Sequence, residues 1–266
     1  MNKTSDPGEV KMTFAEHLEE LRRRLVRAGL VISVVFCLGW FIFPGPLESL
    51  FMLPHRWAVE RLAAREPPVL FEPRLAVLSP LEQIFYRVKV ALLVSGVAGL
   101  PYLLFELWGF VGAGLFRNER RAVMRYLPWS LLLALVGIVF GFLVLIPFVL
   151  EYLYGMPDPK QFVQAYRLES YFSLFLLFTL ALAAMFQLPL IMLGLHAAGI
   201  GSAAFYSKYR RHFIVGDFVV SAVITPPEPV SMILMAIPMM LLYEVGVAGI
   251  RIAERRKRRA PAGARG

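Results

Sequence analysis

A short charged stretch near the amino end is the first place where side chains could do chemistry. Met12 to Leu25 reads M-T-F-A-E-H-L-E-E-L-R-R-R-L and sets carboxylates and a histidine beside three arginines. A guanidinium presents a fork of donors that a carboxylate accepts, often through two parallel hydrogen bonds. Glu20 and Arg24 lie four residues apart, so they can also form an ion pair within one helix, contributing about 0.3 kcal/mol. The stretch therefore predicts either a binding surface for basic groups or an internal ion pair.

The sequence lacks the patterns of familiar enzymes. His17 and Glu20 have helical spacing, but a zinc site requires three or four protein ligands. No H-E-x-x-H, G-x-S-x-G, phosphate-loop or nucleotide-binding glycine pattern occurs. An intramembrane enzyme would explain the Glu and His residues, yet no set of three such groups suggests a site. We expect no catalytic residues, no metal and no cofactor.

The composition predicts an all-α integral membrane protein. Hydrophobic residues make up 58% of the 266 residues and charged residues only 18%. A bilayer core of about 30 Å requires roughly 20 apolar residues per helix, and long runs without alternation favour helices over a barrel. We predict one membrane domain with six transmembrane helices, of which the last two are short. The spans are 25–43, 81–111, 126–150, 170–195, 212–225 and 231–248.

Basic residues predict the orientation of these spans. An even number of spans places both termini on one side, and four basic segments fall there: before spans one and five, between spans two and three, and after span six. The positive-inside rule makes that side cytoplasmic. We therefore predict a multi-pass membrane protein with both termini in the cytoplasm. The net charge of +9 follows from this topology, so we expect the basic tail, 251–266, to meet anionic lipids and no nucleic acid to bind.

The charged stretch should form a short amphipathic cytoplasmic helix that leads into the first span. Leu18, Leu21 and Leu25 follow helical spacing and predict an apolar stripe lying on the membrane, with the glutamates facing water. The apolar run that follows lacks the small-residue cleavage pattern of a secretory signal, so we expect it to remain as a span.

Several longer motifs resemble those of the TatC family of the twin-arginine protein translocase. They are H-L-E-E-L-R-R-R-L at the amino end, S-P-L-E-Q-I-F-Y-R-V-K-V at 79–90, L-P-Y-L-L-F-E-L-W-G-F-V-G-A-G-L-F-R-N-E-R-R at 100–121, F-Q-L-P at 186–189, I-T-P-P-E-P at 224–229 and L-L-Y-E-V-G at 241–246. These motifs cover nearly the whole chain in the family's order, so the resemblance is specific as a set.

The resemblance implies a receptor rather than a catalyst. TatC proteins bind the twin-arginine signal peptides of folded precursor proteins and gather single-span TatA/TatB-type subunits, and transport is driven by the protonmotive force. The resemblance also implies an oligomer in the cytoplasmic (inner) membrane of a bacterium or archaeon. Carried over to this chain, it assigns signal-peptide binding to residues of the opening stretch and of the first cytoplasmic loop: Glu20, Arg22, Phe110, Glu119, Arg120 and Arg121.

A second set of candidates consists of polar residues in or near the last three spans: Gln187, Asp217, Glu228 and Glu244. Many family members have an acid where Gln187 stands, Glu228 replaces a frequent Asp, and Ala113 replaces a frequent Pro. An amide forms hydrogen bonds but exchanges no proton, so we expect Gln187 to order partner helices or water in a shielded cavity. The short spans five and six would offer a docking edge for partner helices.

A proton-coupled small-solute transporter is the alternative function. It would explain charged groups in the membrane, but it predicts a midplane pocket with several ionisable groups and often two repeated halves. No internal repeat is visible in the sequence. Binding of a twin-arginine precursor would separate the two functions.

Overall fold

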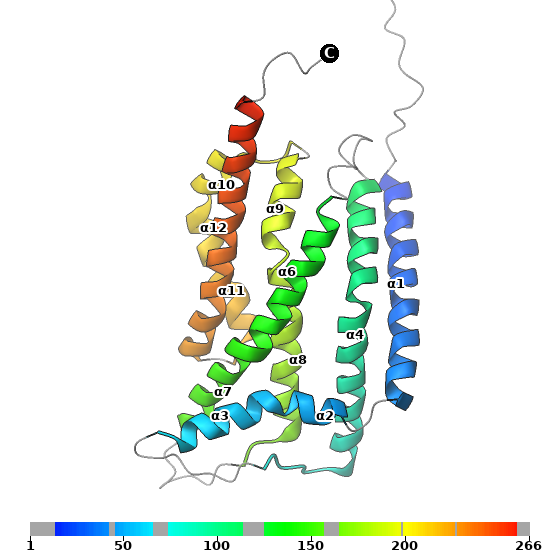
Figure 1. Ribbon diagram of the computed structural model, residues 1–266, viewed down its shortest axis with the longest axis vertical. Coiled ribbons are helices and arrows are strands. Elements are labelled where there is room, and N and C mark those ends of the chain that lie inside the picture. Colours follow the sequence, from blue (N-terminus) through cyan, green and yellow to red (C-terminus); the bar gives the residue numbers. More distant parts are fainter. Residues whose placement is uncertain are drawn as a thin grey trace, which may run out of the picture.

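The fold is a set of long helices that run side by side, with two short helices lying across one end (Figure 1). The computed structural model describes residues 14–42, 46–65, 74–113, 125–156, 165–197, 199–226 and 228–259. Within these ranges the regular structure is helical, apart from one isolated bridge between Ala76 and Arg167. The predicted all-α fold is confirmed.

The elements have the following bounds. The long ones are α1 (Phe14–Ile42), α4 (Pro80–Ala113), α8 (Leu168–Met185) followed by α9 (Leu188–Ala197), and α12 (Pro229–Arg259). A further long element is made of α6 (Leu127–Phe140), the π-helical turn η1 (Gly141–Leu145) and α7 (Ile146–Gly155). The shorter helices are α2 (Pro46–Phe51), α3 (Leu53–Ala63), α10 (Ala203–Lys208) and α11 (Arg210–Ile224).

Five stretches among the described residues are long and apolar enough to cross a membrane. They are Ala15–Phe41, Pro80–Phe110, Leu127–Gly155, Leu168–Ala197 and Pro229–Arg256, and they coincide with predicted spans one to four and six. The predicted fifth span falls on α11, whose 15 residues reach only about 22 Å, less than the hydrocarbon core of about 30 Å. A multi-pass helical protein is therefore confirmed, whereas the count of six spans stays a prediction.

From Phe14 on, the opening charged stretch forms the first turns of α1, so the predicted short amphipathic helix runs into the first span without a break. Phe14–Ile42 is one helix of 29 residues, because no proline interrupts it and single glycines cost only about 1 kcal/mol in a helix. Leu18 and Leu25 on the predicted apolar stripe are 48% and 66% exposed. The stripe therefore faces away from the rest of the chain, as a membrane-facing surface would.

Prolines account for the breaks in two of the long elements. Pro189 lacks an N–H, and its ring collides with the carbonyl four residues earlier, which belongs to Met185. The last residue of α8 is Met185, and α9 begins at Leu188. Likewise, Pro147 follows the π-helical turn η1, which widens the helix ahead of the proline. The first break places Gln187 in the turn between α8 and α9.

The end of the bundle that carries α2 and α3, which we call the cap end, is closed by aromatic and charged contacts. His55 is buried, and its Nδ1 lies 3.0 Å from the Tyr154 hydroxyl. Glu82 accepts hydrogen bonds from the backbone N–H groups of Leu78 and Glu169 at 2.9 and 3.1 Å. Inside this end, α8 contributes the largest fully buried side chains: Phe172, Phe175 and Phe178. The His55 contact holds α3 against α7, and the Glu82 contacts hold the start of α4 against the start of α8.

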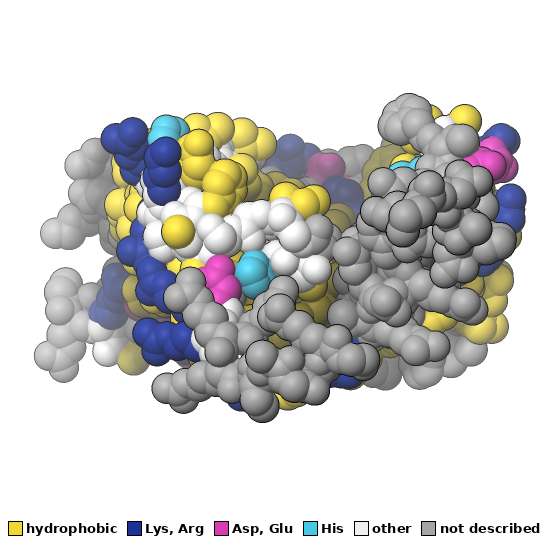
Figure 2. Space-filling view, turned by 90° about the horizontal axis from the view of Figure 1, so that it is seen from above, with side chains coloured by type: hydrophobic (Ala, Val, Ile, Leu, Met, Phe, Trp, Pro, Cys, Tyr) yellow, Lys and Arg dark blue, Asp and Glu magenta, His cyan; other side chains and the backbone are white. Residues whose placement is uncertain are grey.

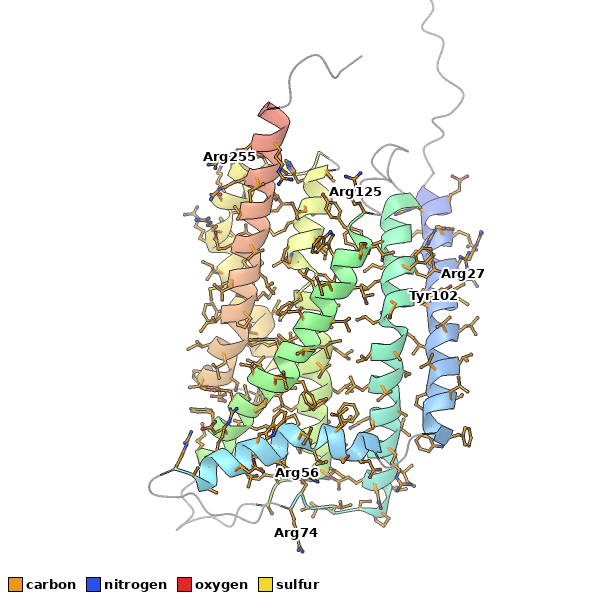
Figure 3. All side chains as sticks on the ribbon, in the orientation of Figure 1. Arg27, Arg56, Arg74, Tyr102, Arg125 and Arg255 are labelled. Atoms are coloured by element: carbon orange, nitrogen blue, oxygen red, sulfur yellow. The ribbon has the colours of Figure 1, made fainter. Side chains whose placement is uncertain are left out.

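The opposite end, which we call the basic end, carries an excess of Lys and Arg side chains. Figure 2 looks onto this end and shows them gathered over the α10–α12 side. In Figure 3, Arg125 and Arg255 lie at this end, whereas Arg56 and Arg74 lie at the cap end. The basic residues of this end whose side chains the structure describes are Arg22, Arg23, Arg24, Arg27, Arg125, Lys208, Arg210, Arg211, Arg251, Arg255 and Arg256. They outnumber the acidic ones, which are Glu16, Glu19, Glu20, Glu106, Glu244 and Glu254.

Candidate functional site

The opening motif and the motif at the end of α4 meet where α1 lies along α4, near the basic end. Figure 3 shows Arg27 of α1 and Tyr102 of α4 at neighbouring heights in this contact. Only 6% of the apolar part of α1 is fully buried, and other residues of it are half-buried. Polar contacts with α4 therefore matter for where the first turns of α1 lie.

Glu106 is the centre of this contact. Its side chain is only 4% exposed, and its Oε2 accepts a hydrogen bond from Arg24 Nη1 at 2.9 Å. Its other oxygen, Oε1, accepts from the Tyr102 hydroxyl at 2.8 Å, and Arg27 Nη1 lies 3.7 Å from it. A buried carboxylate is costly unless it is paired and hydrogen-bonded, and these three side chains from both helices meet that need.

Arg24 lies between two carboxylates. Besides Glu106, it contacts Oε1 of Glu20, with its Nε at 2.7 Å and its Nη2 at 2.6 Å. The side chains of Arg24 and Glu20 are 13% and 17% exposed. Among the described residues, Oε2 of Glu20 accepts no hydrogen bond, so one carboxylate oxygen is open to a further donor. The internal ion pair that the spacing predicted is present, but it is part of a larger network.

Two residues on α4 complete the contact. Gly109 leaves room for Arg24, because a Cβ at this position would lie 2.1 Å from its Nη1 and 2.9 Å from its Cζ. One residue further, the Phe110 ring stacks on His17 of α1, with ring centroids 4.3 Å apart and planes 19° apart. Phe110 thus lies on the same contact as Glu20.

The predicted signal-binding residues divide into three groups in the structure. Glu20 and Phe110 come together at the α1–α4 contact. Arg22 lies on the exposed surface of α1. The remaining three, Glu119, Arg120 and Arg121, lie outside the described residues.

Gln187, from the second set of candidates, is held within the chain. It is 6% exposed, and its Oε1 accepts a short hydrogen bond from the Ser130 hydroxyl. Its Nε2 donates to the backbone carbonyl of Ser130 at 3.0 Å. This reciprocal pair joins the start of α6 to the turn between α8 and α9. The amide therefore orders two helices of this chain, whereas the sequence predicted partner helices or water.

The other three candidates occupy separate environments. Asp217 is 1% exposed and has only Ser221 Oγ near Oδ1, at 3.5 Å, while its Oδ2 is buried without a partner among the described residues. Glu228 caps α12 by accepting from the N–H groups of Val230 and Ser231. Glu244 is exposed and lies 2.6 Å from Arg210. The second set is thus not one site, and only Asp217 lies in a shielded, unsatisfied position.

Sequence reasoning missed Glu106, Tyr102 and Gly109, although all three lie in the quoted motif at 100–121. The available signal was an acidic residue within an apolar span, which is rare and usually functional. No group of three His, Cys, Asp or Glu side chains in the described ranges is placed to hold a metal.

Comparisons with known proteins agree on one family. The family model described as Sec-independent protein translocase protein (TatC) matches residues 16–238. A protein of that name from Koribacter versatilis is 33% identical over 252 residues, covering 93% of this chain and 89% of the relative. One from Aquifex aeolicus is 30% identical over 250 residues, covering 93% and 98%. A crystal structure described as the twin arginine translocase receptor TatC is similar with a TM-score of 0.73 at 28% identity, covering 90% of this chain and 99% of that chain.

Proposed function

Because the chain belongs to the TatC family, we propose that it is the signal-peptide receptor and core subunit of a twin-arginine translocase. In this role it binds the twin-arginine signals of folded precursors, which then cross the membrane at the expense of the protonmotive force. The family match covers nearly all of the chain and favours this function over a small-solute transporter.

The α1–α4 contact is the observation that supports the receptor role most directly. Glu20 has an open carboxylate oxygen in a position that is 17% exposed, and Phe110 lies on the same contact. Glu119 is six residues beyond Ala113, the last residue of α4, and lies outside the described residues. We propose that Glu20 and Glu119 each accept one arginine of the signal, with Arg22, Phe110, Arg120 and Arg121 around them.

We further propose six spans, with α11 as the short fifth one and both termini in the cytoplasm of a bacterial or archaeal cell. The excess of basic side chains at the basic end supports this orientation.

In a variant without Cys37, single cysteines at Ala63 and Pro159 should react with an impermeant thiol reagent in intact cells. Cysteines at Asn118 and Ser207 should not react. Labelling at 118 from outside would overturn the orientation.

The proposed partners are single-span TatA/TatB-type subunits, anionic lipids and further copies of this chain in an oligomer. The α11–α12 edge is the proposed docking surface for partner helices. Val215, Val219 and Val223 of α11 are 65%, 60% and 79% exposed, so this edge presents an apolar face. The basic residues that follow Gly249 at the end of α12 would meet anionic headgroups.

Binding of a twin-arginine signal peptide to Glu20→Gln tests the receptor role. A charge-assisted hydrogen bond contributes on the order of 1.5 to 3 kcal/mol, so affinity should fall about 10- to 150-fold. Glu19→Gln is the matched control, because Glu19 lies on the same turn of α1 and is exposed. Wild-type affinity in the Glu20 variant would remove Glu20 from the site.

A further inference from the structure

We propose that Glu106 is a positioning residue that keeps Glu20 available to the signal peptide by drawing the guanidinium of Arg24 onto its own carboxylate. The inference rests on the proposed function, in which Glu20 accepts an arginine of the signal. Glu106 itself does not touch the signal in this arrangement. It acts through Arg24.

Charge balance is the first reason. Glu20 and Arg24 alone would form a neutral pair within α1, with little attraction left for an incoming guanidinium. Glu106 adds a second carboxylate to the same guanidinium, at 2.9 Å from Nη1. The positive charge of Arg24 is thereby divided between two anions. Arg27 compensates only weakly, because it is 47% exposed and 3.7 Å away, where solvent screens its charge. The network therefore retains negative charge at Glu20.

Burial is the second reason. Glu106 is 4% exposed, whereas Glu20 is 17% exposed. Electrostatic interactions strengthen away from water, so burial strengthens the Glu106 contact, although Arg24 makes two shorter contacts with Glu20, at 2.6 and 2.7 Å. When an arginine of the signal reaches Glu20, Arg24 can give up that contact and still neutralise Glu106. No buried charge is left unpaired during the exchange, which would otherwise be strongly unfavourable.

The shape of α4 is the third reason. At Gly109, a Cβ would lie 2.1 Å from Arg24 Nη1, the same nitrogen that donates to Glu106. A glycine in mid-helix costs about 1 kcal/mol relative to alanine. Its presence at this position provides the space through which the guanidinium reaches the buried carboxylate.

The experiment measures binding of a synthetic twin-arginine signal peptide to the full chain in lipid nanodiscs. Glu106→Gln keeps the shape of the side chain and removes its charge, so Arg24 should turn fully to Glu20. We expect affinity to fall about 5- to 20-fold, as for the loss of one nearby charge in a partly shielded site. Arg24→Gln combined with Glu106→Gln should bring affinity back to within about 3-fold of wild type, because Glu20 is then unopposed; such non-additivity marks direct coupling.

Gly109→Ala is the second variant, since it changes no charge and favours the helix. Pushing Arg24 away from Glu106 should weaken signal binding by a similar factor. Gly96→Ala is the matched control: it makes the same change on α4 at a position where an added Cβ would meet no described atom within 4 Å, so affinity should stay within about 3-fold of wild type.

The outcomes separate this inference from the function on which it rests. If Glu20→Gln weakens binding while Glu106→Gln and Gly109→Ala do not, Glu106 has no positioning role and the receptor role stands. If the double variant binds as weakly as Glu106→Gln alone, Glu106 acts by direct contact or by maintaining the fold, and the inference is overturned. If Glu20→Gln binds like wild type, the α1–α4 contact is not the receptor site, and the positioning role of Glu106 is rejected with it.

Discussion

The α1–α4 contact and the contact between α6 and the α8–α9 turn bury polar side chains to nearly the same extent but satisfy them differently. Glu106 is 4% exposed and Gln187 is 6% exposed. Gln187 exchanges two hydrogen bonds with one residue, Ser130, so donors and acceptors match within the pair. Glu106 is shared among side chains from two helices, and its main partner, Arg24, is shared again with Glu20.

This difference separates a structural contact from an exchangeable one. A matched neutral pair gains nothing from a new partner, so it fixes the packing of its helices. A guanidinium placed between two carboxylates can be replaced at one of them by another guanidinium, because charge and geometry are the same on both sides of the exchange. Recognition of arginine is therefore expected at the α1–α4 contact, and a fixed packing of helices where α6 meets the α8–α9 turn.

The largest effect is expected when both proposed acceptors of the signal's arginines are neutralised. Glu20→Gln with Glu119→Gln should reduce signal binding by about 100-fold or more, since each charge-assisted contact contributes on the order of 1.5 to 3 kcal/mol. The protein should still accumulate in the membrane, because neither change touches the buried pair at Gln187. Photocrosslinking to a precursor provides the measurement, and a Lys-Lys signal should lose less than an Arg-Arg signal. Unchanged binding at physiological salt would mean that both glutamates are solvated charges with no role in binding the signal.

The matched pair should respond in the opposite way. Gln187→Leu removes the acceptor of the buried Ser130 hydroxyl, at a cost of about 1 to 3 kcal/mol. We expect a lower thermal midpoint in detergent, weaker assembly with partner subunits and unchanged signal binding. Gln187→Glu retains an acceptor for the Ser130 hydroxyl and should cost less. A leucine variant with wild-type stability would show that the pair does not hold α6 against the turn between α8 and α9.

The same contrast explains what the sequence could and could not predict. The lengths of the apolar runs were enough to predict the five spans found in the structure, because the bilayer thickness determines how many residues a spanning helix needs. The break before Leu188 follows from Pro189, by a rule that acts within one turn. The amphipathic helices α2 and α3 were not predicted, because they are short and their hydrophobic faces depend on the ends of other helices.

Prediction at the site failed where a partner is remote in the sequence. The ion pair between Glu20 and Arg24 follows from spacing alone, and Phe110 follows from the family motif. Glu106 is 82 residues from Arg24, and their contact depends on how α1 is rotated against α4. Helical periodicity does not specify that rotation, since the apolar part of α1 is exposed on most sides. The reason for a glycine at position 109 is visible only in the structure, where the Arg24 guanidinium occupies the space that a Cβ would take.

A third polar position, Asp217, tests whether an unsatisfied group behaves like either contact. Its Oδ2 is buried without a partner among the described residues, so the isolated chain carries a group with an uncompensated desolvation cost. Asp217→Asn should raise the stability of the isolated chain by about 1 kcal/mol, measured by thermal unfolding in detergent. If Asp217 meets a donor on a partner helix, the same variant should weaken assembly. Loss of stability in the isolated chain would mean that the carboxyl is already satisfied there.

The smallest effect is expected at the exposed ion pair between Arg210 and Glu244, which has good geometry but no shielding. The two atoms Nη2 and Oε2 lie 2.6 Å apart, yet the side chains are 41% and 49% exposed. Exposed pairs contribute about 0 to 1 kcal/mol because water and salt screen them. Glu244→Gln should therefore shift the thermal midpoint slightly at low salt and not at all near 1 M salt, with signal binding unchanged. A large, salt-independent loss would show that distance alone sets the strength of these pairs. Burial of Glu106 would then add nothing to the strength of its contact with Arg24.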